Sequence, residues 1–175
     1  QAQAIIGTYP NLFETLYLAG LRAKIGLSTE KNGDNDLVQT LLNLMIRNGT
    51  DYTLTFRRLC DLISIGSDSD EAVRDLFGNS SDFDNWVFRW RKRLAEEAVG
   101  TVKRQEAMRR LNPAYIPRNH LVEEAINSAI NDEDFTCFDK LITVVSLPYA
   151  DQPNCEKYAA SPRPDQVVRA TFCGT

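Results

Sequence analysis

The 175-residue sequence has no apolar run of the length that crosses a membrane, no glycine-rich phosphate loop and no GxSxG motif. A membrane-spanning helix needs about 20 consecutive apolar residues, so we expect no membrane segment and no membrane partner. No basic segment precedes an apolar core at the start, so no secretory signal is expected. The one histidine, His120, has no nucleophile at a recognisable spacing. We therefore expect a chain without a reaction centre of its own.

The cysteines are few and far apart, because Cys60, Cys137, Cys155 and Cys173 form no CxxC pair. Zinc and redox sites use closely spaced Cys and His ligands, and a single histidine cannot complete such a cluster. No metal and no other cofactor is therefore expected in this chain. Since Cys60 and Cys137 fall in helical patterns, we expect both to be buried, reduced thiols.

The hydrophobic content of 43% is that of a globular protein. The apolar residues recur at the three- and four-residue intervals of amphipathic helices. We predict an all-α fold, with a single domain of about seven to eight helices over residues 1–147. Repeated prolines then predict an extended C-terminal tail over 148–175, which carries the terminal cysteine and serves as a strap. Only 166–172 alternates in a way that would allow a strand.

Three of the predicted helices carry large apolar side chains at helical spacing, and each is expected to turn them inward. In the helix over 81–94, Trp86 and Trp90 recur at helical spacing, which favours core packing over a platform for nucleic-acid bases. In the first and last helices, the residues expected to be buried are Leu12, Phe13, Leu16, Tyr17, Leu21 and Ile25, and Phe135, Phe138, Ile142 and Val145.

Two prolines four residues apart, Pro113 and Pro117, lie in the segment 112–121 between two helical patterns. Each proline fixes its own φ, lacks an N–H and keeps the preceding residue out of the helical region. The preceding helix must therefore end at Leu111 or Asn112, and the next can start at Pro117. The pattern predicts a rigid elbow between two helices.

Four side chains in or near this elbow carry structural expectations. Arg118 is expected to tie helix ends and carboxylates together, because a guanidinium can bridge several acceptors at once. His120 is expected to be packed or to cap a helix. Tyr115 and Tyr149 are expected to anchor the strap.

Basic residues are concentrated in one part of a chain whose net charge is −4. The segment 86–118 holds nine of the twenty Lys and Arg residues against three acids. One hypothesis is therefore a stand-alone helical module whose basic face, Arg89 to Arg110, binds nucleic acid or an acidic protein. The net negative charge disfavours nucleic acid as a partner, and a purely structural helical bundle is a further alternative.

Several spaced motifs resemble the C-terminal end of the selenoprotein O family, in that family's order. Residues 111–121 read LNPAYIPRNHL against the family's NPxYxxRNxL, and 147–153 read LPYADQP against PYxxQP. A Tyr-Ala pair at 158–159, the terminal Cys-Gly-Thr and the blocks at 21–27 and 51–59 also look like the family. The residues that carry the central motifs are Asn112, Pro113, Tyr115, Arg118, Asn119, Pro148, Tyr149, Gln152 and Pro153.

The resemblance implies a kinase-like protein adenylyltransferase that transfers AMP from ATP to Ser, Thr or Tyr hydroxyls of other proteins with Mg. The family's phosphate-binding lysines, catalytic aspartate and metal ligands lie upstream of the matched part, so no catalytic, ATP-binding or metal residue is assigned here. Because the chain begins at Gln1, we expect a C-terminal portion whose partners are the upstream kinase-like lobe and the protein substrates. The expected location is cytoplasmic in a bacterium and mitochondrial in a eukaryote.

Cys173 takes the place of the family's terminal cysteine or selenocysteine. The resemblance implies redox control through a disulfide between this residue and a cysteine of the catalytic part. Some members carry a second cysteine three residues earlier, where this sequence has Ala170, so a local CxxC is not available. A thiol near a chain end is accessible for exchange. The alternative is a tail thiol without a role.

Overall fold

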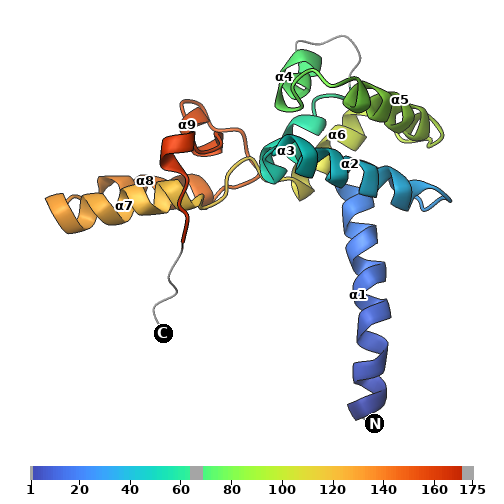
Figure 1. The fold of residues 1–175 in the computed structure, drawn as a ribbon, viewed down its shortest axis with the longest axis horizontal. Coiled ribbons are helices and arrows are strands. Elements are labelled where there is room, and N and C mark those ends of the chain that lie inside the picture. The colour runs from blue at the N-terminus through green and yellow to red at the C-terminus, as the bar shows by residue number, and fades with distance from the viewer. Residues whose placement is uncertain (1, 64–68, 171–175) are drawn as a thin grey trace. The chain divides into compact units, whose positions relative to one another are not determined.

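The computed structural model describes the backbone of residues 2–63 and 69–170, and the side chains of those residues except 2–6, 69 and 70. Within these ranges the chain forms nine α-helices and one 3₁₀ turn, with no strand (Figure 1). The all-α prediction is confirmed, and the ninth helix is a short one inside the predicted strap. The elements are α1 Ala2–Lys24, α2 Asp34–Asn48, α3 Tyr52–Leu59, α4 Ser69–Leu76, α5 Ser81–Ala95, α6 Thr101–Leu111, α7 Asn119–Asp132, α8 Thr136–Val145, α9 Glu156–Ala159 and η1 Pro164–Gln166.

The chain divides into two compact units, Gln1–Asn112 and Pro113–Thr175. The division falls at the proline elbow, and the sequence-based boundary between 147 and 148 lies inside the second unit. The predicted domain boundary between residues 147 and 148 therefore stays a prediction. The possible strand is not formed over 166–170, where the chain turns through η1 and continues without regular structure.

Stacked aromatic rings form the centre of the first unit. Phe77 stacks on Phe83 with ring centroids 4.0 Å apart, and the series continues to Trp86 at 5.9 Å and to Trp90 at 5.4 Å. Each indole N–H donates to a backbone carbonyl 2.8 Å away, Trp86 to Leu37 and Trp90 to that of residue 25. Both tryptophans are buried. The prediction of core packing for this helix is confirmed, because rings inside the core cannot stack on bases.

A carboxylate in the first unit links the loop after α1 to the end of α5. Glu97 accepts hydrogen bonds from the N–H and hydroxyl groups of Ser28 and Thr29, at 2.7–3.2 Å. It also pairs with Arg93 and Arg104, both at 3.1 Å, and its side chain is 3% exposed. Arg93 reaches on to the buried Asp34 at 2.7 Å. One buried anion therefore holds two helices and a loop in place.

The same loop requires a glycine. Gly26 has φ of +81°, and a Cβ there would lie 2.6 Å from the Met108 sulfur. Its carbonyl oxygen accepts from Arg104 at 2.6 Å. Only glycine adopts this conformation without a steric cost while letting α6 approach so closely.

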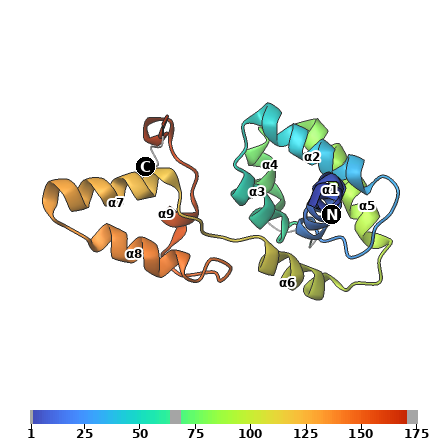
Figure 2. The same cartoon turned by 90° about the horizontal axis from the view of Figure 1, so that it is seen from below.

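The second unit is built on an antiparallel pair, α7 and α8, which lie side by side (Figure 2). Leu121 and Ala125 of α7 are buried, as are Leu141 and Val144 of α8. The prediction for α8 was wrong in register. Of the four residues expected inward, Phe135, Phe138 and Ile142 are exposed and Val145 is half-buried, because the buried stripe of α8 runs through Leu141 and Val144 instead.

The first helix also departs from its predicted burial. Leu21 and Ile25 are buried, whereas the apolar residues before them are exposed: Leu12, Phe13, Leu16 and Tyr17. Every described side chain from 7 to 17 is exposed. The helical periodicity was correct, but the described chain places no element over this face.

The Glu97 network predicts a pH-dependent stability. Burial alone would raise the pKa of Glu97, but the hydrogen bonds from Ser28 and Thr29 outweigh it and hold the pKa far below its ordinary value. A lowered folded-state pKa stabilises above the unfolded-state pKa of about 4.3, and this stabilisation is lost as pH falls below it. We expect Glu97→Gln to lower the free energy of unfolding by about 3 kcal/mol at pH 7, because two buried arginines lose a charged partner.

Urea unfolding at pH 7 and pH 3, followed by tryptophan fluorescence, measures this effect. The deficit of Glu97→Gln should shrink at pH 3, since the unfolded wild-type chain binds a proton there that the folded chain does not. Glu106→Gln, at an exposed position on α6, is the control and should change neither value. Equal deficits at the two pH values would contradict the assignment.

Candidate functional site

Asn112, the first residue of the elbow motif, closes the C-terminal end of α6. Its Nδ2 donates to the Lys24 carbonyl at 2.8 Å, and its Oδ1 accepts from the Lys24 ammonium at 3.1 Å. The same ammonium donates to the Leu111 carbonyl at 3.1 Å. Asn112 is completely buried. This reciprocal pair joins the ends of α1 and α6, and it satisfies carbonyls that a helix end would otherwise leave without a partner.

A second cation lies at the same helix end. Arg57 donates to the Asn112 carbonyl at 3.1 Å and to the Arg109 carbonyl at 3.4 Å. The last carbonyls of a helix carry a partial negative charge, so Lys24 and Arg57 both stabilise α6 through its dipole. Helical spacing places Arg57 beside the apolar face of α3 formed by Phe56, Leu59 and Cys60, yet its guanidinium is buried against α6.

The surroundings of Lys24 are apolar. The Lys24 ammonium lies 5.3 Å from the centre of the Phe56 ring and 5.8 Å from that of Tyr52, and burial lowers its pKa. Nearby, burial raises the pKa of the Cys60 thiol, which donates to the Phe56 carbonyl. A protonated, enclosed thiol is chemically inert. Cys60 is therefore the buried, free cysteine that the sequence predicted, whereas the same prediction for Cys137 was wrong, because Cys137 is only half-buried on α8.

In the second unit, residues of the motif at 111–121 contact residues of the motif at 147–153. The Tyr115 hydroxyl accepts from the Gln152 N–H at 3.1 Å and lies 3.3 Å from the Gln152 carbonyl, to which it can donate. The N–H groups of Ala114 and Tyr115 both donate to the Pro148 carbonyl. The Gln152 amide caps α8 by donating to the carbonyls of Val144 and Leu147, at 2.9 and 3.1 Å. The strap is thereby fixed to the elbow and to the end of α8.

The other motif residues occupy varied positions. Arg118 is buried and donates to the Ala159 carbonyl at 2.9 Å, so it ties the start of α7 to the end of α9. Pro113 is half-buried, and Asn119, Tyr149 and Pro153 are exposed. α7 begins at Asn119, two residues later than Pro117.

Three further residues belong to the elbow and the strap: His120, Cys155 and Cys173. Burial and the neighbouring Arg118 charge lower the pKa of His120, so its imidazole is neutral at pH 7. Cys173 lies outside the described residues, as does the rest of 171–175. The Cys155 thiol is buried beside the elbow, where it packs with Tyr115 and Val144.

The basic face is largely engaged by the chain itself. Besides Arg93 and Arg104, Arg89 pairs with Asp36 and Arg109 pairs with Asp61, both at 2.5 Å. Arg91 donates to the Leu62 carbonyl at 2.8 Å. These contacts give the arginines a structural role, so the nucleic-acid hypothesis gains no support from the geometry.

Metal-ligating side chains do not cluster among the described residues. Over 2–63 and 69–170, no three His, Cys, Asp or Glu side chains gather closely enough to hold a metal ion. A groove on α5 is lined by Leu62, Phe88 and the Arg74–Asp84 pair, whose charges neutralise each other at 2.6 Å. No helix of this part of the chain is long and apolar enough to cross a membrane. We therefore assign no residue here to Mg²⁺ or ATP.

Comparison with known proteins identifies the class and then the family. Curated relatives called protein nucleotidyltransferase YdiU are 48% identical over the whole chain in Bradyrhizobium diazoefficiens and in Rhizobium etli, and 44% over 99% of it in Rhodopseudomonas palustris. The chain spans 35% of the length of each. The family model described as protein adenylyltransferase SelO matches residues 1–146. The chain belongs to this family, which confirms the resemblance carried by its motifs.

Sequence reasoning did not identify the two cations that bind the end of α6 beside the elbow. Lys24 and Arg57 lie in the family-like blocks at 21–27 and 51–59, and this shared membership was the one available signal. Helical periodicity alone assigns charged residues to the outside. It does not show that a long side chain can turn back to a carbonyl 55 positions away, as Arg57 does to Asn112.

Asn112→Ala tests the role of the elbow asparagine. The substitution removes the two hydrogen bonds to Lys24 and a third to the Cys60 sulfur, and it leaves the Lys24 carbonyl and ammonium short of partners, so we expect the free energy of unfolding to fall by about 2–3 kcal/mol. Asn85→Ala, at an exposed position on α5, provides the matched control with a change below about 0.5 kcal/mol. Urea unfolding of both variants is the measurement, and equal values would show that the Asn112 contacts contribute nothing.

Proposed function

We propose that this chain is the helical supporting part of a protein adenylyltransferase and that the remainder of the protein carries out the transfer. The observation that carries the proposal is the match of the adenylyltransferase family model to 1–146, in a chain spanning 35% of its relatives' length. In the proposed reaction, a Ser, Thr or Tyr hydroxyl of a target protein attacks the α-phosphorus of ATP. The hydroxyl proton is lost, the bond to the bridging oxygen breaks, and pyrophosphate leaves.

The distribution of charged groups supports a non-catalytic role for this chain. The buried carboxylates Asp34 and Glu97 are each held by arginine, and Glu97 is fully occupied by hydrogen-bond donors. A general base needs an accessible lone pair near a substrate and a pKa near the working pH. A carboxylate with a pKa far below its ordinary value and donors on both of its oxygens meets neither condition. The side chains here stabilise the fold, and ATP and Mg²⁺ belong to the upstream kinase-like lobe, which is the proposed partner.

Comparison of the full-length protein with residues 1–175 tests this division of roles. We expect the full-length protein to transfer label from α-³²P-ATP to protein in the presence of Mg²⁺, and residues 1–175 to transfer none. Label retained after denaturation and lost on treatment with phosphodiesterase identifies a covalent AMP. Transfer by residues 1–175 alone would overturn the proposed division, and no transfer by the full-length protein would overturn the activity.

A redox role for Cys173 is the second element of the proposal, and it rests on the resemblance of Cys173-Gly174-Thr175 to the family's terminal cysteine motif. Its thiol and that of a cysteine in the catalytic part lose two protons and two electrons to an oxidant such as oxidised glutathione. The product is one disulfide and two molecules of reduced glutathione. In the chain-entropy model, closing so long a loop stabilises by about 4–5 kcal/mol.

Cys173→Ser in the full-length protein tests the disulfide. After treatment with oxidised glutathione, the wild-type protein should lose two titratable thiols and migrate faster in a non-reducing gel. Cys173→Ser should keep both properties of the reduced protein. Cys137→Ser, at a half-buried position on α8, is the control and should still form the disulfide. If Cys173→Ser lost as many titratable thiols as the wild-type protein, Cys173 would have no part in the disulfide.

A further inference from the structure

Residues 9–17 of α1 carry an apolar surface that the described chain leaves uncovered. Five large side chains on this helix are each 48–65% exposed and form what we call the α1 stripe: Tyr9, Leu12, Phe13, Leu16 and Tyr17. The rings stack along the helix, with centroids 6.2 Å apart for Tyr9 and Phe13 and 5.8 Å apart for Phe13 and Tyr17. Figure 1 shows this part of α1 extending beyond the other helices of its unit.

The α1 stripe is continuous and uncharged. At 100° per residue, its five positions fall within about 140° of the helix circumference. Between Ala2 and Leu21 the one charged residue is Glu14, which lies outside that arc. Single exposed apolar residues are ordinary, but a contiguous patch of this kind on a protein surface marks a contact site.

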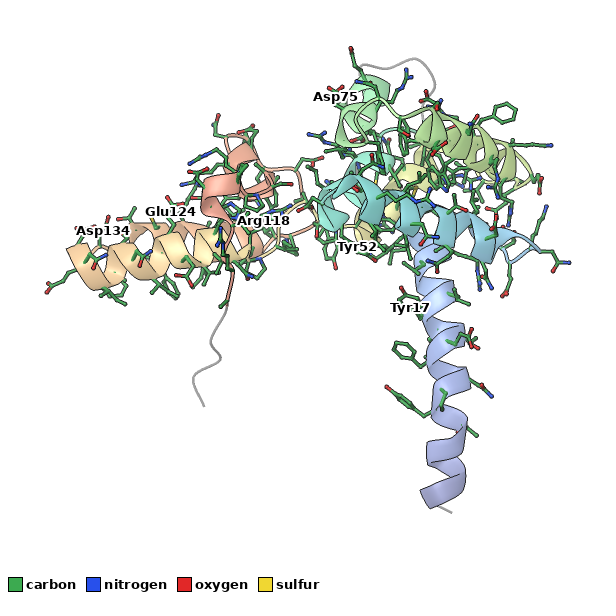
Figure 3. All side chains as sticks on the ribbon, in the orientation of Figure 1. Tyr17, Tyr52, Asp75, Arg118, Glu124 and Asp134 are labelled. Atoms are coloured by element: carbon green, nitrogen blue, oxygen red, sulfur yellow. The ribbon has the colours of Figure 1, made fainter. Side chains whose placement is uncertain are left out.

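The stripe is distinct from the face that α1 buries in its own unit. Leu21 and Ile25 are buried, and by helical geometry they lie roughly 130° around the axis from the centre of the stripe. At the C-terminal end of the stripe, Tyr17 lies near Tyr52 of α3. Burial raises the pKa of the Tyr52 hydroxyl, and the nearby Tyr17 raises it further. Figure 3 labels both tyrosines. Tyr52 is itself half exposed and extends the apolar surface onto α3.

We propose that the α1 stripe docks against the part of the same protein that lies outside residues 1–175. This inference rests on the proposed function, in which the chain supports an upstream lobe. The whole chain aligns with relatives of which it makes up 35%, so about two thirds of their length is available to cover the stripe. A lobe of that length can bury this uncharged stripe without a charged partner face.

The width and charge of the stripe argue against two other occupants. A coiled-coil dimer uses a narrow seam of two positions per heptad, whereas a stripe wider than about 100° is typical of a helix that faces a globular core. A helix that lies on a lipid surface carries Lys and Arg on its polar face, and residues 2–21 contain neither. The pattern therefore favours a protein core over a second copy or a membrane.

Hydrogen exchange of the full-length protein tests the proposal. We expect the amides of residues 9–17 to exchange at least about 100-fold more slowly than an unstructured chain, at all protein concentrations and without lipid. Phe13→Asp places a charge in the centre of the stripe and should abolish most of this protection. The amides of α2 and α5 should keep theirs, which shows that the first unit remains folded.

Two variants control for unrelated effects of an introduced aspartate. Asn11→Asp puts the same residue on the opposite side of α1, and Phe88→Asp replaces a phenylalanine of α5 that is 72% exposed. Both should leave the protection of 9–17 unchanged. Rapid exchange of 9–17 in the wild-type protein would overturn the proposal. So would protection that rises with protein concentration, which indicates a second copy, or protection that requires vesicles, which indicates a lipid surface.

The result is separable from that of the AMP-transfer assay. Protection of 9–17 in a full-length protein that transfers no AMP would retain the docking surface and reject the activity. AMP transfer by a protein in which 9–17 exchange freely would retain the activity and reject the docking surface.

Discussion

The first unit depends on the placement of one negative charge inside it. Taking the Glu97 carboxylate out of water is costly unless its lone pairs are filled, and here the donors of Ser28 and Thr29 and two arginines fill them. Because these partners come from the loop after α1, from α5 and from α6, the carboxylate is satisfied only when all three are in position. This condition fixes the loop that contains Gly26, and Gly26 in turn allows α6 to approach.

Cations also explain how α6 is held at both ends. Arg104, in its first turn, donates to the carbonyls of Leu94 and Val99, which lie at and beyond the end of α5. At its last turn, Lys24 and Arg57 bind its final carbonyls. A proline follows Asn112, so no glycine cap can close this helix, and cations satisfy the carbonyls that a glycine cap would have satisfied. Of these three cations, only Arg104 belongs to the basic segment 86–118.

Local rules predicted the helices well and their surroundings less well. The proline elbow ended α6 at Leu111, and the spacing of Trp86 and Trp90 placed both indoles in the core, because backbone geometry and helical period are properties of short segments. The inward burial of Phe13 and Phe138 failed, since periodicity shows which residues share a face and not what covers it. The buried positions of Arg57 and Arg104 also could not be predicted, because Arg104 reaches the Gly26 carbonyl across 78 positions of sequence.

The exposed apolar faces of α1 and α8 have a physical origin different from that of the buried arginines, whose partners lie within the chain. A helical pattern records the burial that a sequence acquires in its complete protein, and this chain amounts to 35% of the length of its relatives. Where the partners of a face lie within the chain, as for Trp90, pattern and structure agree. On α1 and α8 the apolar side chains are present and the covering surface is not among the described residues. Under the proposed docking, the free energy of burying the α1 stripe, about 25 cal/mol per Å² of apolar area, is gained only in the full-length protein.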